Sequence, residues 1–155
     1  MSTLEIREPP SKFETFAYFF IFSCRSEKIL KDLKVKRIVN CTHNIPNFHE
    51  KDFLYHNFQV GKWRQHYSET DSTKLSDFVQ DYINFISEAL EAGDSVLVHC
   101  LAGAHRAGTA GIIVLMYLAD INKEDAEKAA KLARPVIEPI GGLKDFICLV
   151  ETRKS

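Results

Sequence analysis

Residues 75–92 carry apolar side chains at the spacing of an amphipathic helix. These side chains recur every three or four positions and share one face, while polar residues occupy the other; they are Leu75, Phe78, Val79, Tyr82, Ile86, Ala89 and Leu90. Gly93 follows directly and indicates where the helix ends, because glycine commonly terminates helices. This is the clearest helix that the sequence predicts.

Shorter apolar runs predict strands that alternate with further helices. The runs are rich in aromatic and β-branched residues, which is typical of strands, and they lie at residues 16–22, 37–41, 53–60 and 96–99. Ser26 and Asn122 stand where helix N-caps are expected, and Pro135 ends the helix that Asn122 begins. The predicted helices are 26–33, 111–119, 122–134 and a final one from about residue 142, and residues 61–73 are predicted to be irregular.

This order of elements indicates the fold class. Strands that alternate with helices predict an α/β domain, in which a central, mostly parallel sheet is flanked by helices on both faces. The length of 155 residues fits one domain, and 45% hydrophobic residues are enough to form a core. We therefore predict a single domain over residues 1–155, with its core at about 13–152.

Charge and cysteine spacing argue against several classes of protein. The 20 basic and 21 acidic residues leave a net charge of -1, which does not indicate a nucleic-acid or membrane-surface protein. The four cysteines lie far apart, without the spacing of a disulfide framework or a zinc site. The polar start of the chain shows no signal-peptide pattern. We expect a monomer with reduced thiols and no metal ion, located in the cytoplasm or the nucleus.

Residues 96–119 combine the features of an anion site with a nucleophile. A predicted strand leads through a loop with glycines into a predicted helix, whose N-terminus presents free N–H groups and partial positive charge. Gly103 allows the loop to curl, and Gly108 allows close packing where the helix begins. Cys100 stands at the end of the strand and Arg106 in the first turn of the helix.

The pairing of Cys100 with Arg106 suits the transfer of a phosphoryl group. Amide dipoles and a guanidinium favour the thiolate, which is the nucleophilic form of cysteine. The planar guanidinium can hold two phosphate oxygens, so attack on phosphorus would give a phosphocysteine that water then hydrolyses. A lone buried cysteine is more often an inert core residue, but packing does not explain the glycines and Arg106 beside Cys100.

The segment HCLAGAHRAGT resembles the His-Cys-x5-Arg signature of the protein tyrosine phosphatases, and the short chain resembles their dual-specificity branch. The segments RIVNC, FISEAL…SVLVHC and ARPVIEPIGGLKDFICLVE are also similar to stretches of that family, so the resemblance covers most of residues 16–152. It implies a cofactor-independent enzyme that hydrolyses phosphotyrosine, phosphoserine and phosphothreonine in phosphorylated proteins.

The resemblance also implies roles for the matching residues. Cys100 would be the nucleophile, and Arg106 would bind phosphate together with the backbone amides of Leu101, Ala102, Gly103, Ala104 and His105. His99 would order the loop. The family usually has a serine or threonine hydroxyl directly after the arginine, and this chain has Ala107. We therefore expect slow hydrolysis of the phosphoenzyme, with Thr109 as the candidate to replace that hydroxyl.

The family's general acid has no clear match, because residues 61–69 resemble a local insertion. Asp71 is our first candidate and Glu69 the alternative, although Asp71 equally suits the start of a helix. Trp63, Arg64 and His66 precede these residues and are candidates for the rim of the pocket.

Cys41 is a candidate redox partner. Some relatives protect the nucleophile through a disulfide to a second cysteine in this region. The alternative interpretation is a small buried residue.

Two other functions stay open. Ala107 and the uncertain acid favour a catalytically weak phosphate-binding pseudophosphatase, whereas the intact Cys100 and Arg106 argue against it. A phosphatase for phosphoinositides or RNA 5′ ends is the other alternative. Enzymes that act on highly charged lipids tend to carry lysines in the loop, where this chain has the small or apolar residues Leu101, Ala102 and Ala104.

Overall fold

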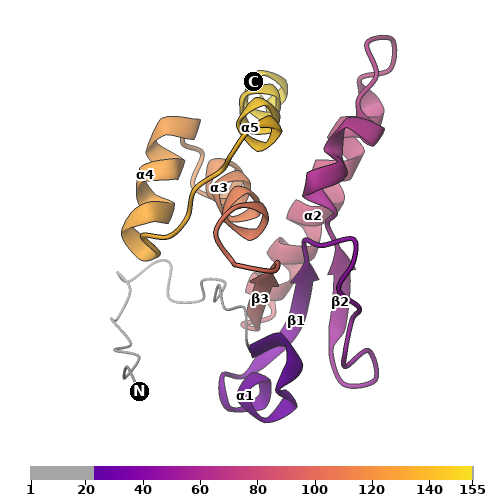
Figure 1. Cartoon of the computed structure of the whole chain (residues 1–155), viewed down its shortest axis with the longest axis vertical. Helices are drawn as coiled ribbons and strands as arrows, with labels where there is room; N and C mark the ends of the chain where they lie inside the picture. Colours follow the sequence, from indigo (N-terminus) through magenta and orange to yellow (C-terminus); the bar gives the residue numbers. More distant parts are fainter. Residues whose placement is uncertain (1–22, 155) are drawn as a thin grey trace.

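Three parallel strands form the centre of the computed structural model, which describes residues 23–154 (Figure 1). The strands are β1 (Val35–Asn40), β2 (Leu54–Asn57) and β3 (Ser95–His99), and β1 lies between the other two. Asn40, the last residue of β1, pairs with Asn57 in β2 and with His99 in β3. The carboxyl ends of all three strands therefore meet at one edge of the sheet, which is where parallel sheets generally bind ligands.

The two faces of the sheet are covered by different helices. Ile38 of β1 and Leu97 of β3 pack in a small cluster with Leu30 of α1 (Glu27–Asp32). The intervening residues of these strands face the larger cluster, which the other helices complete: α2 (Thr73–Glu91), α3 (Arg106–Leu118), α4 (Lys123–Ala133) and α5 (Gly142–Lys154). The predicted α/β class, with helices on both faces of a parallel sheet, is confirmed.

The predicted helix ends are confirmed by their hydrogen bonds. The Ser26 hydroxyl accepts from the Ile29 N–H at 3.3 Å, and the Asn122 side chain accepts from the Asp125 N–H at 2.8 Å. Gly93 follows the end of α2 with a φ of 72°, which favours glycine. These starts and stops could be predicted because each depends on residues only a few positions apart.

Some boundaries differ from the prediction. The strand predicted over 53–60 is shorter, because a 3-10 segment, η2 (Val60–His66), begins where Val60 turns into the core. This segment also replaces part of the stretch predicted to be irregular. A second short 3-10 segment, η1 (Ser23–Arg25), precedes α1. The helix α3 begins at Arg106, which the sequence placed in its first turn, and it includes most of the apolar stretch predicted over 111–119. The strand predicted over 16–22 lies outside the described residues.

Aromatic rings connect η2 and α5 to the sheet and to α2. Phe58, just beyond β2, stacks on Tyr82 of α2 with ring centroids 4.2 Å apart, and Trp63 of η2 stacks on Phe146 of α5 at 5.4 Å. Tyr82 is fully buried, and its hydroxyl donates to the Ala110 carbonyl of α3 at 2.9 Å. Burial raises the pKa of Tyr82 well above its usual range, so the phenol stays a donor. These contacts hold four elements around the carboxyl edge of the sheet.

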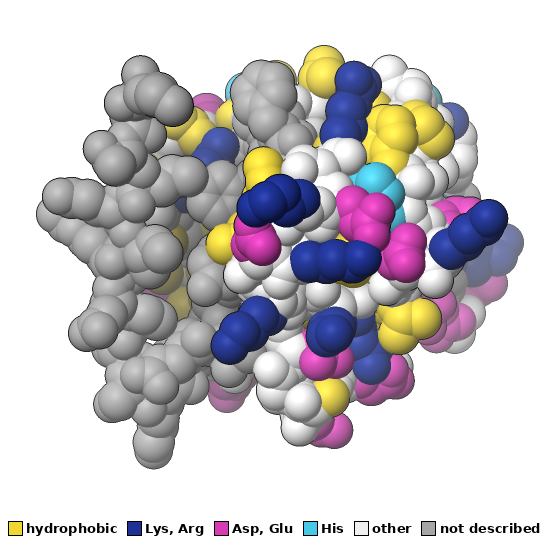
Figure 2. Space-filling view, turned by 90° about the horizontal axis from the view of Figure 1, so that it is seen from below, with side chains coloured by type: hydrophobic (Ala, Val, Ile, Leu, Met, Phe, Trp, Pro, Cys, Tyr) yellow, Lys and Arg dark blue, Asp and Glu magenta, His cyan; other side chains and the backbone are white. Residues whose placement is uncertain are grey.

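The surface is mixed in charge. Lys and Arg side chains alternate with Asp and Glu across the face shown in Figure 2, where neither sign gathers into one patch. Exposed groups of opposite sign also form ion pairs, such as Lys28 with Asp32 at 2.7 Å, and such pairs add little stability. No helix within residues 23–154 has the length and apolar character needed to cross a membrane.

Replacing Tyr82 with phenylalanine should destabilise the fold by about 1 kcal/mol, the net value of one buried hydrogen bond. The stacking on Phe58 would remain, so the change isolates the bond to Ala110. Urea unfolding measures the difference. Tyr117→Phe is the matched control, since Tyr117 also lies in the core region but its hydroxyl has no hydrogen bond among the described residues. An equal decrease in the free energy of unfolding in both variants would contradict this role of the Tyr82 hydroxyl.

Candidate active site

Cys100 follows β3 directly and begins a tight loop, residues 100–106, which we call the phosphate loop. Its side chain is 3% exposed, and its Sγ accepts a hydrogen bond from the Gly103 N–H at 3.1 Å. Gly103 has a φ of 63°, in the left-handed region that residues with a Cβ disfavour. The glycine therefore turns the chain so that a backbone amide points at the sulfur, as the sequence suggested.

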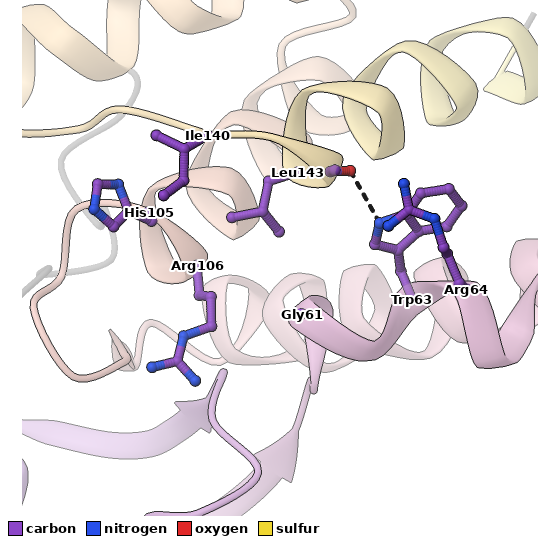
Figure 3. Close-up of a pocket in the computed structure, with 8 residues that line it drawn as sticks. Gly61, Trp63, Arg64, His105, Arg106, Ile140 and Leu143 are labelled. Carbon is purple, nitrogen blue, oxygen red and sulfur yellow. Dashed lines mark hydrogen bonds between the residues drawn. The ribbon is translucent and has the colours of Figure 1, made fainter.

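Arg106 is the first residue of α3, and its guanidinium lies on the concave side of the phosphate loop (Figure 3). Gly61 of η2 packs against its stem, since a Cβ at position 61 would lie 3.5 Å from the Arg106 Cδ. The N-terminus of α3 also brings its free amides and partial positive charge to this point. The sequence-predicted nucleophile and phosphate ligand are thus brought to the same loop.

Cys41 lies beside both of these residues. It follows β1, and its N–H donates to the His99 carbonyl at 2.8 Å, which continues the pairing of β1 with β3. Complete burial raises the pKa of the Cys41 thiol well above its usual range; the negative charge of Cys100 raises it further, and Arg106 acts in the opposite direction. Cys41 is therefore a protonated thiol next to the phosphate loop.

His99 and Thr109 support the phosphate loop from within the core. His99 is 1% exposed, and burial lowers its pKa while a hydrogen bond with the Cys100 backbone acts against that shift. A neutral, buried ring of this kind fits the predicted ordering role. Thr109 donates its hydroxyl to the His105 carbonyl at 2.7 Å. Its proton is therefore committed to the loop, and a role for Thr109 at the sulfur stays a prediction.

A cavity of about 310 Å³ opens beside Arg106 (Figure 3). Residues from η2, from the phosphate loop and from the start of α5 line it: Gly61, Trp63, Arg64, His105, Arg106, Ile140, Gly142 and Leu143. Trp63 and Arg64 thus lie where the sequence placed them, whereas His66 stacks on Phe78 with ring centroids 4.0 Å apart. Sequence reasoning missed the wall formed by residues 140–143, for which the adjacent glycines 141 and 142 were the only visible signal.

Close packing joins η2 to the start of α5 on one side of this cavity. The Trp63 Nε1–H donates to the Gly142 carbonyl at 3.0 Å, and the Arg64 guanidinium lies over the indole, 4.5 Å from its centroid. A Cβ at Gly142 would come within 2.5 Å of the Arg64 Nη1. Glycine at 142 therefore leaves room for Arg64 to lie flat across the rim.

Asp71 lies away from the phosphate loop. Its carboxylate accepts hydrogen bonds from the Thr73 N–H at 2.9 Å and the Thr73 hydroxyl at 2.6 Å, and these bonds lower its pKa. The loop that carries Asp71 and Glu69 contacts Arg153, which donates to the Ser72 carbonyl at 2.9 Å. Arg153 lies roughly 16 Å along α5 from Gly142, at the helical rise of about 1.5 Å per residue.

A general acid must carry a proton and reach the leaving group. In this arrangement Asp71 is an ionised residue that caps the start of α2, as the alternative interpretation of the sequence proposed. The catalytic role of Asp71, and that of Glu69 beside it, stay predictions that would require the loop to move. Within residues 23–154, no group of three or more His, Cys, Asp or Glu side chains is placed to hold a metal ion.

Comparison with known proteins gives consistent matches. Residues 17–153 match the family described as "dual specificity phosphatase, catalytic domain". Dual specificity protein phosphatase 9 of Homo sapiens is 37% identical over 121 residues, which cover 76% of this chain and 30% of that protein. Dual specificity protein phosphatase 6 of Homo sapiens is 34% identical over 124 residues, covering 76% and 31%. The chain thus spans less than a third of the length of these relatives.

A solved structure shows the same fold. Human DUSP28 superposes with a TM-score of 0.67 at 19% identity, over 85% of this chain and 84% of that one. At this identity the likeness shows the fold alone.

Oxidation by hydrogen peroxide should join Cys41 to Cys100 in a disulfide. Peroxide would convert the Cys100 thiolate to a sulfenic acid, and the Cys41 sulfur would then displace water from it. A thiol reductant should restore the protein fully, whereas Cys41→Ser should be oxidised irreversibly. Peptide mass spectrometry identifies the bridge, with Cys148→Ser as the control because Cys148 is exposed. Absence of a peptide that links residues 41 and 100 would contradict the prediction.

Proposed function

Because this chain belongs to the dual specificity phosphatase catalytic-domain family, we propose that it hydrolyses phosphate monoesters on proteins through a phosphocysteine intermediate. The proposal depends above all on one observation: the Cys100 sulfur accepts the Gly103 amide while Arg106 lies across the same loop. Phosphotyrosine is the proposed principal substrate, with phosphoserine and phosphothreonine as further ones.

In the first step the Cys100 thiolate attacks phosphorus. A sulfur–phosphorus bond forms as the ester bond breaks, and the leaving oxygen takes up a proton. The Gly103 N–H favours the thiolate, and the start of α3 adds a partial positive charge. Arg106 and the loop amides would hold the non-bridging oxygens, so the negative charge of the transition state faces donors that are already in place.

In the second step water attacks phosphorus and the thiolate leaves. A hydroxyl at position 107 would help by donating to the departing sulfur, but this chain has the fully buried Ala107 there. The Thr109 hydroxyl is committed to His105. We therefore infer that breakdown of the phosphoenzyme is slower than its formation.

The leaving group should determine which substrates react fastest. General acid help is worth roughly 10²–10⁴ in rate, and the described residues bring no carboxylic acid to the cavity. A phenol, with a pKa near 10, leaves far more readily without that help than an aliphatic alcohol. Apolar contact with Ile140 and Leu143 would also suit an aromatic ring. Both arguments favour phosphotyrosine over phosphoserine.

The chemistry also supports a proposed location. A thiolate nucleophile works only while it is reduced, and the thiols of cytosolic and nuclear proteins are kept reduced. We propose that the protein acts there on phosphorylated proteins.

Incubation with an aryl phosphate should release an initial burst of about one phenol molecule per enzyme molecule, followed by slower steady turnover. Ala107→Ser should raise the steady rate roughly tenfold, the effect of one charge-assisted hydrogen bond, and reduce the burst. Stopped-flow absorbance measures both phases. Ala133→Ser, at the exposed end of α4, is the matched control, and Cys100→Ser should be inactive. A wild-type protein that retains phosphopeptides without turnover would instead be a binding module.

Asp71→Asn and Glu69→Gln test the general acid. Because Asp71 is bonded to Thr73 at the far end of α5 from the cavity, we expect each change to alter kcat/KM for an alkyl phosphate by less than about threefold, against the 10²–10⁴ that a general acid supplies. The ratio kcat/KM is the quantity to compare, because it reports formation of the phosphoenzyme. Steady-state kinetics at several pH values provide the comparison. A 10²–10⁴-fold fall in the rate of one variant would identify that residue as the acid and show that the loop closes over the cavity.

A further inference from the structure

A short hydrogen bond joins the phosphate loop to residues 134–141, which link α4 to α5 and which we call the connecting segment. The Nδ1 atom of His105 lies 2.6 Å from the carbonyl oxygen of Glu138. In the other direction, the Glu138 N–H donates to the Ala104 carbonyl at 3.0 Å. The two segments are therefore connected twice, once through the backbone alone and once through the imidazole of His105.

The connecting segment forms one wall of the cavity. Ile140 belongs to it, and it leads directly into Gly142 and Leu143, which also line the cavity. Ile140 and Leu143 lie across the cavity from Gly61 (Figure 3). A shift of the segment would therefore change the width of the cavity. The phosphate ligands belong instead to the phosphate loop and to α3.

Packing holds this segment at two positions. Ile137 is 1% exposed and rests on α3, where a Cβ at Gly108 would lie 2.9 Å from its Cγ2, and Pro139 is buried as well. Glu138 and Ile140, on either side of Pro139, are exposed. The Glu138 carboxylate pairs with Lys131 at 3.0 Å and with Lys144 at 3.8 Å, but all three side chains are in contact with solvent and such pairs hold weakly. The hydrogen bonds to the phosphate loop are the stronger restraint on the part that lines the cavity.

The chemistry of the bond determines the state of the imidazole. A carbonyl oxygen can only accept, so Nδ1 must carry the proton at this separation. Both the neutral Nδ1–H tautomer and the imidazolium meet this condition. The ring points away from the Arg106 guanidinium, toward the side on which Ile140 lies (Figure 3). His105 thus contributes its backbone to the phosphate loop, while its side chain serves the wall of the cavity.

We propose that His105 is a positioning residue, whose imidazole holds the connecting segment against the phosphate loop and so sets the wall that contacts the substrate beyond its phosphate. The kinetic consequence depends on the proposed phosphatase function. The structural consequence, a restrained segment around Glu138, does not depend on turnover.

Three substitutions separate this role from a general need for a side chain at position 105. In His105→Asn the amide nitrogen stands two bonds from Cβ, as Nδ1 does, so the bond to Glu138 can form. In His105→Gln the amide nitrogen is one bond further out, at the place of Nε2, and cannot form it in the same geometry. His105→Leu has no donor. Because the side chain is partly exposed, all three variants should fold, which urea unfolding verifies.

Peptide kinetics and inhibition by inorganic phosphate give the first readout. For a phosphotyrosine peptide, the Gln and Leu variants should raise KM by about 3- to 10-fold, the effect of one net hydrogen bond. Inorganic phosphate has no group that extends to the wall, so its inhibition constant should change by less than twofold in these variants. The Asn variant should have a peptide KM closer to the wild-type value than the Gln and Leu variants. Equal KM values in all four proteins, or an Asn variant as impaired as Leu, would overturn the proposal.

Hydrogen exchange and NMR give a second readout that needs no turnover. The Glu138 amide should exchange about 3- to 10-fold faster in the Gln and Leu variants and at the wild-type rate in Asn, and a ¹H–¹⁵N spectrum should show the His105 proton on Nδ1. A proton found only on Nε2, or unchanged exchange in every variant, would overturn the proposal. If the wild type is inactive but these results are as expected, the phosphatase function fails and the positioning role stands.

Discussion

The site depends on one constraint: the chain must turn within four residues of the end of β3 so that a backbone amide meets the Cys100 sulfur. Gly103 makes this possible with a φ of 63°, and its N–H lies 3.1 Å from the sulfur. A residue with a Cβ would be strained there, and the loop would have to open. If it opened, the amides at the start of α3 and the guanidinium of Arg106 would no longer be directed at the same position. A phosphate site needs both sets of donors together.

The rest of the fold keeps this turn in place. The pairing of β1 with β3 sets where β3 ends, and it brings Cys41 beside the nucleophile. The stacked rings of Phe58 and Tyr82, and the bond from Tyr82 to Ala110, hold α2 and α3 around the loop. Segments far along the chain then build the cavity on this base: η2 supplies Trp63, and the connecting segment is held through His105. The phosphate ligands are local in sequence, whereas the walls are distant.

That difference explains what could be predicted from the sequence. The site is formed by three residues within a stretch of seven: Cys100, Gly103 and Arg106. The type of each residue alone indicates its role as nucleophile, turn or phosphate ligand. Ser26 and Asn122 were predictable for the same reason. The contact of His105 with Glu138 spans 33 positions, and no periodic pattern or motif marks it. Arg64 lies on Gly142 across an even longer separation in sequence, and the lack of a side chain at 142 was the one sign of this contact. Asp71 had two interpretations of equal weight, and the backbone around Thr73 supports the capping one.

The central claim is that Cys100 is the atom to which phosphate is transferred. It is tested most directly by quenching the protein in denaturant during the first turnover of an aryl phosphate and mapping the modified peptide by mass spectrometry. The account predicts phosphate on Cys100, present in most molecules because the second step is slow, and absent in Cys100→Ser. Steady turnover without any phosphate on Cys100, or phosphate attached to another residue, would contradict it.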